Sequence, residues 1–251
     1  MRESEYRAIY SAEDTHWWYL GLRELVFASL REYSCGKKNA REISVLDAGC
    51  GTGASLLRLS VEGYSCCGLD FSATALGFCK ERGLERLVRG SVSELPFKSA
   101  SFDAVVSLDV IYHAAVKDDV HAMREFRRVL KKDGILIMNL PAFEFLRSPH
   151  DLANQTKTRY TKEMLGERLK EAGFAVERLT YRNTALFPVI AAVRLAKKLM
   201  PGRPDSKDSD LGEVNPFVNR ALSSVLSLEN RLLKAASMPF GTSVFCVARR
   251  A

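Results

Sequence analysis

The feature that most constrains the fold of this 251-residue chain is the run ISVLDAGCGTG at residues 43–53. Its apolar start is rich in β-branched residues and predicts a buried parallel strand. Asp47 closes this strand, and glycines follow at positions 49, 51 and 53. Glycine has no Cβ, so the loop can turn tightly and let a ligand approach its backbone. A helical segment comes next, and open α/β sheets bind ligands at such carboxyl strand ends.

The glycine spacing differs from the dinucleotide-binding pattern GxGxxG. Here it is GxGxG, preceded by a carboxylate that would repel a pyrophosphate but suit an ammonium group. The string VLDAGCGTG resembles motif I of the class I S-adenosylmethionine (SAM) dependent methyltransferases, in their type 11-like, small-molecule branch. The resemblance covers about residues 42–247. It implies a methyltransferase enzyme with SAM as cofactor and S-adenosylhomocysteine as product.

Strands and helices alternate along the chain. Further strands are predicted at about 66–70, 87–89, 102–108, 135–140, 174–182 and 242–248. Helices are predicted at about 3–33, 54–59, 72–82, 118–131, 161–172, 187–199 and 214–236. This alternation predicts an α/β fold, a Rossmann-like seven-stranded, mostly parallel sheet with helices on both faces.

We expect one domain with two additions to the bare sheet. Residues 1–40 would form an N-terminal helical lid, 41–182 the core sheet, 183–241 a helical insertion between strands six and seven, and 242–251 the last strand. A connection of some sixty residues must carry structure of its own. Its polar stretch at 201–213 is predicted to be a mobile loop.

Composition narrows the class of protein. No apolar run is long enough for a transmembrane helix, and the polar N-terminus does not resemble a signal peptide. Six cysteines without a CxxC pair suit reduced thiols in a cytoplasmic protein, and we expect no metal site. The net charge of +7 suits solubility, or an anionic partner such as nucleic acid or a membrane surface.

The resemblance assigns the cofactor contacts residue by residue. It implies that the glycine loop lines the methionine part of SAM, and that Asp70, which closes the second strand, binds the ribose hydroxyls. A carboxylate facing a diol accepts two charge-assisted hydrogen bonds, although Asp70 could instead cap the next helix. Where the family's adenine loop carries Asp, this chain has Ser91, whose hydroxyl can also accept. The expected cofactor-binding residues are Tyr19, Arg23, Asp47, Gly49, Cys50, Gly51, Asp70, Phe71, Ser72, Ser91, Val92, Leu108 and Asp109.

The adjacent Trp17 and Trp18 in the N-terminal segment have two interpretations. They pack against the sheet edge, or they form a lid whose aromatic faces suit the sulfonium cation. The resemblance extends to the WWYLGLR segment and makes Tyr19 and Arg23 candidates for the methionine carboxylate. Substrate binding is therefore expected at Trp17, Trp18, His113, Arg159 and Tyr160.

The expected catalytic residues are His113, Tyr112 and Tyr160. His113 follows the fourth strand and could accept a proton from a hydroxyl or amine nucleophile, because histidine titrates near neutrality. The alternative is a structural or orienting histidine. We favour O-methylation, with N- or C-methylation as alternatives, on a small molecule of natural-product, lipid or glycan type.

Other functions stay open. The basic composition leaves an RNA or protein methyltransferase as an alternative, although we expect no nucleic-acid partner because no added binding module follows the core. A methyltransferase fold can also bind SAM without methylating, as in a cyclase. The apolar segment at 186–200 either caps a substrate pocket or makes peripheral membrane contact. A monomer and a homodimer are both compatible with the sequence.

Overall fold

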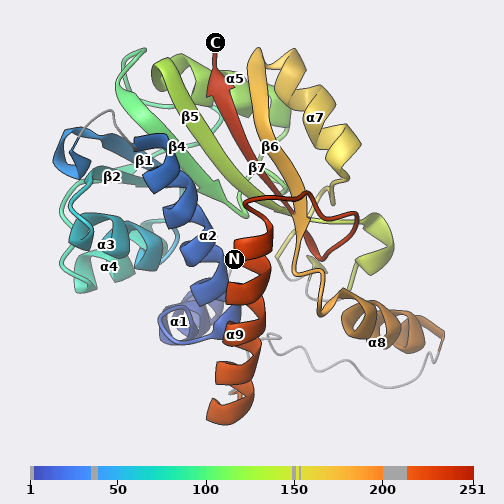
Figure 1. Ribbon diagram of the computed structural model, residues 1–251. Helices are drawn as coiled ribbons and strands as arrows, with labels where there is room; N and C mark the ends of the chain where they lie inside the picture. Colours follow the sequence, from blue (N-terminus) through green and yellow to red (C-terminus); the bar gives the residue numbers. More distant parts are fainter. Residues whose placement is uncertain (1–2, 35–38, 149–150, 153, 200–213) are drawn as a thin grey trace.

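The computed structural model describes residues 3–34, 39–148, 151–152, 154–199 and 214–251. Helices and strands alternate as the sequence predicts, and Figure 1 shows them along the chain. The helical elements are α1 (Glu3–Ala12), α2 (Trp17–Ser34), η1 (Ala40–Glu42), α3 (Ala54–Val61), α4 (Ala73–Glu81), α5 (Asp119–Val129), η2 (Glu144–Leu146), α7 (Lys162–Glu171), α8 (Phe187–Leu199) and α9 (Pro216–Leu232). The strands are β1 (Ser44–Ala48), β2 (Ser65–Asp70), β3 (Leu87–Arg89), β4 (Phe102–Leu108), β5 (Leu130–Pro141), β6 (Phe174–Arg182) and β7 (Ser243–Arg250).

The seven strands form one sheet in the order β3-β2-β1-β4-β5-β7-β6. Neighbouring strands pair in parallel from β3 to β5, whereas β7 is antiparallel to both β5 and β6. Strand β6 therefore runs in the same direction as β1, β2, β4 and β5, and all their carboxyl ends lie at one edge. We call this the carboxyl edge. The predicted Rossmann-like, mostly parallel sheet is confirmed.

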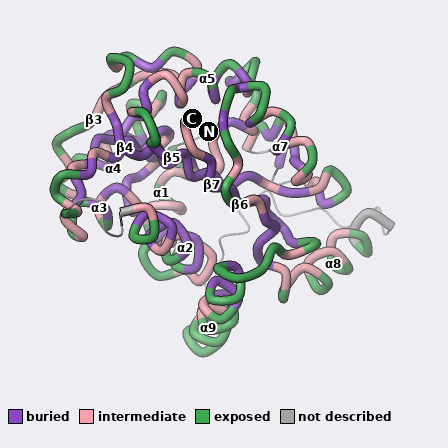
Figure 2. The backbone as a smooth tube through the Cα atoms, turned by 45° about the horizontal axis from the view of Figure 1, so that its top comes forward, coloured by how far each residue is buried: buried purple, intermediate pink, exposed green. Residues whose placement is uncertain are grey.

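Alternate residues of the strands enter two hydrophobic cores, one on each face of the sheet. One core packs Leu46, Val105 and Leu136 against α5 and α7. The other packs Val45, Val106 and Ile137 against α2, α3 and α4. Helices thus cover both faces (Figure 1), and the strands between them are largely buried (Figure 2). The residues that directly follow these strands lie at the carboxyl edge, because the strands end there.

Several boundaries differ from the sequence prediction. The predicted single helix over 3–33 is two helices, because the chain leaves the helical path between Ala12 and Trp17. The predicted helix over 118–131 ends at Val129, and β5 begins at once, so this strand is longer than expected. The expected mobile loop at 201–213 lies outside the described residues.

Helix α2 of the N-terminal segment and helix α9 of the insertion lie side by side (Figure 1). Gly21 allows the close approach of α2 and α9, because a Cβ there would lie 2.6 Å from Leu226 Cδ1. Asn230 Nδ2 donates to Gly21 O at 2.8 Å, and the backbone N–H of Trp17 donates to Asn219 Oδ1 at 2.9 Å. Helices α2 and α9, one from each predicted lid segment, therefore form one packed unit.

Helix α8 lies apart from this unit and leaves Val189, Val193 and Leu195 exposed. It contacts η2, and the Arg194 guanidinium donates to Leu146 O. None of the helices that the structure describes is long and apolar enough to cross a membrane.

Candidate functional site at the carboxyl edge

The glycine loop after β1 has the backbone form that its sequence predicts. Gly49 has a φ of +90°, and a Cβ there would lie 2.3 Å from Val110 Cγ2. Gly51 has a φ of +54° and has no atom within 4 Å of the position that a Cβ would take. Both conformations favour glycine. Gly51 therefore leaves free space on the side where a side chain would project, although its N–H donates to Asp70 and its carbonyl accepts from the Cys79 thiol.

Two carboxylates flank this loop at the ends of β1 and β2. Asp47 is 2% exposed, and its Oδ2 has no hydrogen-bond partner among the described residues. Burial, with Asp70 nearby, raises the pKa of Asp47 to about 7. Asp70 accepts from the backbone N–H of Gly51 at 2.9 Å and of Ser72 at 2.8 Å. Asp70 thus fixes the loop as well as presenting a charge at the edge.

The turn between α1 and α2 is fastened to the glycine loop by a group that we call the Glu13 cluster: the buried Glu13, Thr52 and Arg82 side chains and the exposed Asp14. Thr52 Oγ1 donates to Glu13 Oε1. The Arg82 guanidinium pairs with Glu13 at 2.9 Å and with Asp14 at 2.8 Å, and its Nε donates to Thr52 O at 2.9 Å. Helix α1 is thereby held against the site, as expected of a lid.

Tyr19 and Arg23 lie on the first turns of α2, beyond this cluster. Burial and the nearby charges of Glu13 and Asp109 raise the pKa of Tyr19 above its ordinary value. Burial lowers the pKa of Arg23, while Glu13 and Asp14 raise it. The structure therefore brings both predicted residues to the carboxyl edge, between the glycine loop and the end of β4.

Asp109 ends β4 in a left-handed conformation, with a φ of +55°. Its two carboxylate oxygens accept from Asn139 Nδ2 at 3.0 and 3.1 Å. Burial raises the pKa of Asp109 to about 6, although Arg182 and Asn139 act in the opposite direction. A buried carboxylate that titrates near this value is typical of a functional group.

Tyr112 lies near Asp109 and Tyr19, and His113 follows it in the same loop. Burial raises the pKa of Tyr112, and Asp109, Asp151 and Tyr19 add to the effect. His113 Nδ1 accepts from the backbone N–H of Ala115 at 3.0 Å. That bond occupies the lone pair of a neutral imidazole and leaves the proton on Nε2. This contact is compatible with an orienting histidine, and the expected role of His113 as proton acceptor stays a prediction.

Tyr160 and Arg159 are engaged in the packing of the chain. The fully buried Tyr160 donates its hydroxyl to Asp119 Oδ2 at 2.7 Å, and Arg168 lies over its ring. Arg159 pairs with Asp151 at 2.8 Å and donates from Nε to Ala142 O at 2.9 Å. These contacts give both residues a place in the packing of the chain, and the catalytic and substrate-binding roles expected of Tyr160 and the substrate-binding role expected of Arg159 stay predictions.

The residues expected around adenine are less enclosed. Phe71 is 70% exposed, so its ring does not pack into the site in this conformation. Ser72 caps α4 by accepting from the backbone N–H of Ala75 at 3.3 Å. Ser91 Oγ accepts from the backbone N–H of Ser93 at 3.1 Å, and the Val92 side chain is buried in the core.

Two predicted cofactor residues use their side chains for packing. The Cys50 thiol lies 4.0 Å from Cys79 Sγ of α4, so only the backbone of Cys50 is left to contact a ligand. Leu108 packs against the core on the α2 side. The five described cysteines are free and buried, as the sequence predicts.

Sequence reasoning missed the most unusual residue of the edge, Arg182. This arginine ends β6, is fully buried, and has three side-chain nitrogens with no hydrogen-bond partner. Its guanidinium lies 5.1 Å from the Trp18 ring. The same rule that identified Asp47 and Asp70, a charge directly after an apolar strand, could have indicated it. The Glu13 cluster had no such signal, because its members lie far apart in sequence.

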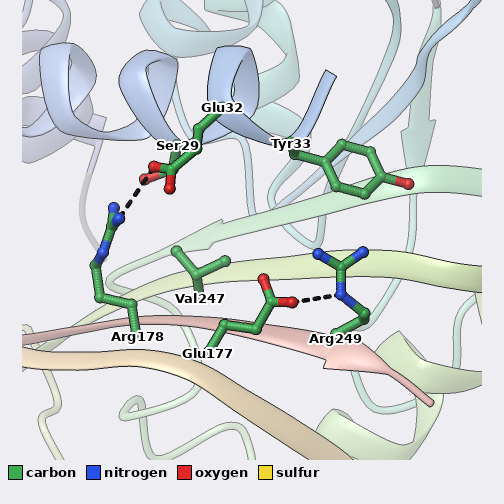
Figure 3. A pocket seen from close by; sticks show the side chains of 7 residues that line it. All are labelled: Ser29, Glu32, Tyr33, Glu177, Arg178, Val247 and Arg249. Carbon is green, nitrogen blue, oxygen red and sulfur yellow. Dashed lines mark hydrogen bonds and ion pairs between the residues drawn. The ribbon is translucent and has the colours of Figure 1, made fainter. Parts of the chain in front are cut away.

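An open pocket of about 440 Å³ lies elsewhere, between α2 and the strands β6 and β7 (Figure 3). Two ion pairs cross it: Arg178–Glu32 at 3.0 Å and Arg249–Glu177. None of its lining residues belongs to the predicted site. Self-paired charges leave little for a ligand to bind, so we assign the site to the carboxyl edge.

Comparisons with known proteins identify the kind of domain. Residues 46–138, from β1 into β5, match the family model described as a methyltransferase domain. A protein of Encephalitozoon cuniculi named as a methyltransferase is 43% identical over 99 residues, which is 39% of this chain and 45% of that protein. The Bos taurus protein named probable tRNA methyltransferase 9B is 28% identical over 162 residues, 64% of this chain and 34% of that protein. The chain thus spans less than half the length of either relative.

The fold has solved counterparts. A protein of Galdieria sulphuraria named as a sarcosine dimethylglycine methyltransferase superposes with a TM-score of 0.61 at 18% identity. The match covers 93% of this chain and 86% of that one. Motif I at the end of β1, the strand order of the sheet and the family match over residues 46–138 together support a SAM-dependent methyltransferase of class I, with SAM as its cofactor.

Proposed function

We propose that this protein transfers the methyl group of SAM to a small-molecule acceptor bound at the carboxyl edge. The single observation that carries the proposal is the enclosure of this edge. The α1–α2 turn is fastened to the glycine loop through the Glu13 cluster. Helix α9 is fastened to the end of β6, because Glu229 accepts from the backbone N–H groups of Thr184 and Ala185 at 2.8 and 3.1 Å. An enclosed edge suits a small acceptor better than a polymer.

The residues present fit SAM. The unpartnered Oδ2 of Asp47 offers an acceptor to an ammonium group, the space beside Gly51 is free, and Arg23 provides a cation for a carboxylate. Asp70 would face the ribose hydroxyls. When bound, SAM supplies an activated methyl group, so the protein mainly holds the acceptor in line and excludes water.

The chain's own residues then account for orientation and proton transfer. Tyr19 and Tyr112, both facing Asp109, would position the acceptor beside the end of β4. Asp109 is the residue there with the pKa suited to accepting a proton from a hydroxyl or amine, because it is ionised above about pH 6. Asn139 Nδ2 donates to both carboxylate oxygens of Asp109 and so orients the carboxylate. O-methylation remains our preferred reaction.

A tRNA acceptor is the second candidate, favoured by the relatives named tRNA methyltransferases and by the net charge of +7. A shared fold and a shared cofactor do not fix the acceptor, so these names alone do not decide between the two candidates. The two candidates predict different chemistry for the labelled product and different sensitivity to salt.

The test is to incubate the protein with SAM labelled in its methyl group and either the small-molecule fraction or the RNA fraction of a cell extract. We expect label in the small-molecule fraction, and loss of that label in the Asp109→Asn variant. Labelled RNA alone, with incorporation falling steeply as salt rises, would overturn the small-molecule proposal in favour of the second candidate. SAM binding, measured separately, shows that the protein used is active in binding its cofactor.

A further inference from the structure

Arg182 is a buried cation whose charge has no partner in the described part of the chain. Its side chain is fully buried, and Nε, Nη1 and Nη2 all lack a hydrogen-bond partner. An ionised group in such surroundings costs several kcal/mol unless something pairs with it. Burial lowers the pKa of Arg182 only to about 10, so the guanidinium stays charged at neutral pH.

The acids near Arg182 are already engaged. Asp109 accepts both hydrogen bonds from Asn139 Nδ2, and Glu229 accepts from backbone N–H groups that follow β6. Both carboxylates are near enough to raise the pKa of Arg182, but neither forms a hydrogen bond with it. The chain pairs other buried arginines directly, as Arg82 with Glu13 and Arg159 with Asp151. Arg182 differs from them because the N–H groups of its planar guanidinium form no hydrogen bond with the described residues.

Arg182 lies on the acceptor side of the site. In the sheet, Arg182 and Pro141 pair with the same residue, Ser243, so the end of β6 is level with the end of β5. Two further buried atoms without partners lie near the ends of the same strands, namely Asn139 Oδ1 of β5 and Asn183 Oδ1 directly after β6. Trp18 covers the guanidinium from α2 at 5.1 Å. Such clustered polar atoms indicate a bound polar ligand.

The ligand that suits this fork is an anion. A guanidinium presents parallel N–H donors that match a carboxylate or a phosphate in a bidentate arrangement. Two sources could supply the anion: the acceptor or the methionine carboxylate of SAM. Strand β6 lies four places from β1 in the sheet, on the order of 19 Å at the usual strand spacing. The methionine is expected beside β1 and Arg23, so this distance favours the acceptor.

We propose that Arg182 binds a carboxylate or phosphate group of the acceptor, and so selects small anionic molecules for methylation. This inference rests on the proposed function, because it assigns the acceptor of that reaction. Trp18 would close over the bound anion, which gives the adjacent tryptophans of the sequence a role in acceptor binding.

The direct test uses tryptophan fluorescence. The chain has two tryptophans, so a Trp17→Phe background leaves Trp18 as the single reporter. Inorganic phosphate and acetate are titrated, at constant ionic strength, into protein saturated with S-adenosylhomocysteine. We expect both anions to change the Trp18 emission, and Arg182→Met to weaken that binding by about 10- to 100-fold. Arg182→Lys should retain part of it.

Arg178→Met is the matched control. Arg178 is an arginine of the same strand, but it pairs with Glu32 in the pocket of Figure 3. Its replacement should leave anion binding unchanged. Thermal melting separates binding from folding: Arg182→Met should melt no lower than the parent protein, because it removes an unpaired buried charge. A strongly lowered melting temperature, with Arg182→Lys restoring it and no anion response in the parent, would indicate a structural arginine and overturn the inference.

The other outcomes distinguish the sources. If Arg182→Met weakens S-adenosylhomocysteine but not 5′-methylthioadenosine, which lacks the amino-acid part, then Arg182 binds the cofactor's carboxylate and the inference is wrong. Equal anion binding by the parent and Arg182→Met also overturns it. Should the parent fail to bind S-adenosylhomocysteine at all, the proposed function fails, and the inferred acceptor with it. An anion response that still depended on Arg182 would then reveal an anion site outside methyl transfer.

Discussion

At the residue scale, the site is built from acids whose burial raises their pKa. Asp47 and Asp109 end β1 and β4, and their pKa values lie near 7 and 6. Burial disfavours the charged form of each carboxyl group, so each holds its proton to a higher pH than an exposed aspartate does. A fold selected for stability alone would replace such groups, so their presence points to ligand binding. Asp47 and Asp109 could be found from the sequence because each directly follows an apolar strand.

Asp47 should make the stability of the ligand-free protein depend on pH. Its folded pKa of about 7 exceeds the ordinary aspartate pKa of 3.8, so between these pH values the folded state holds a proton that the unfolded state releases. The free energy of unfolding should therefore fall as pH rises from about 4 to 7. Asp47→Asn removes this pH-dependent part of the free energy of unfolding. At about 1.4 kcal/mol per pKa unit, the variant should be more stable than the parent at pH 8 by at most about 4 kcal/mol.

Denaturant unfolding at pH 5 and pH 8 measures this difference. The gain from Asp47→Asn should be larger at pH 8, while the affinity for S-adenosylhomocysteine should fall. An equal effect of the substitution at both pH values would contradict the raised pKa of Asp47.

Gly51 should be required for cofactor binding rather than for folding. Its φ is positive and nothing lies within 4 Å of a Cβ position, and the same is true of Gly83 at the end of α4. An alanine at either position costs about 1–2 kcal/mol in backbone strain. Only Gly51 faces the expected cofactor.

The measurement compares Gly51→Ala with Gly83→Ala. Both should lower the melting temperature by similar amounts, and only Gly51→Ala should weaken S-adenosylhomocysteine by tenfold or more. Equal affinities of the two variants would show that no ligand approaches the Gly51 backbone.

At the scale of elements, the N-terminal helices are held by buried polar contacts rather than by apolar packing alone. Helix α1 has no buried residues, so the Glu13 cluster is what fixes the turn after it to the glycine loop. The sequence predicted a helical lid but not its break at residues 13–16. The polar residues there look like any exposed helix face, and only Arg82, about seventy residues away, makes them a buried turn.

Arg82→Met should release the α1–α2 turn. Glu13 would remain buried without its cation, which costs about 3–5 kcal/mol when a buried pair is broken. We expect faster amide exchange in α1 and weaker S-adenosylhomocysteine binding, with little change in the sheet.

Hydrogen exchange read by mass spectrometry measures this release. Arg124→Met, which breaks the exposed pair with Glu171 at 3.0 Å, is the control and should change neither quantity. Unchanged protection of α1 in Arg82→Met would mean that the cluster does not hold the lid.

At the scale of the whole molecule, the alternating elements predicted the sheet and its ligand-binding edge. Six of the seven strand positions agree with the structure to within two residues, and only β5 begins clearly earlier than predicted. Buried parallel strands such as β1 and β4 are continuous apolar runs, which makes them easy to predict. The sequence does not show the order of β7 and β6, which places Arg182 level with Pro141. It also does not show that α9 packs on α2, since this contact joins residues about two hundred positions apart. The acceptor side was therefore less predictable than the cofactor side.

The central claim is that SAM binds at the carboxyl edge between β1 and β2. Calorimetric titration of the purified protein with S-adenosylhomocysteine, beside the Asp70→Asn variant, tests it most directly. We predict one site per chain in the parent protein, with affinity reduced by about 10- to 100-fold in Asp70→Asn, because the neutral amide loses charge-assisted hydrogen bonds to the ribose. No binding by the parent protein, or equal binding by both, would contradict this account of the site.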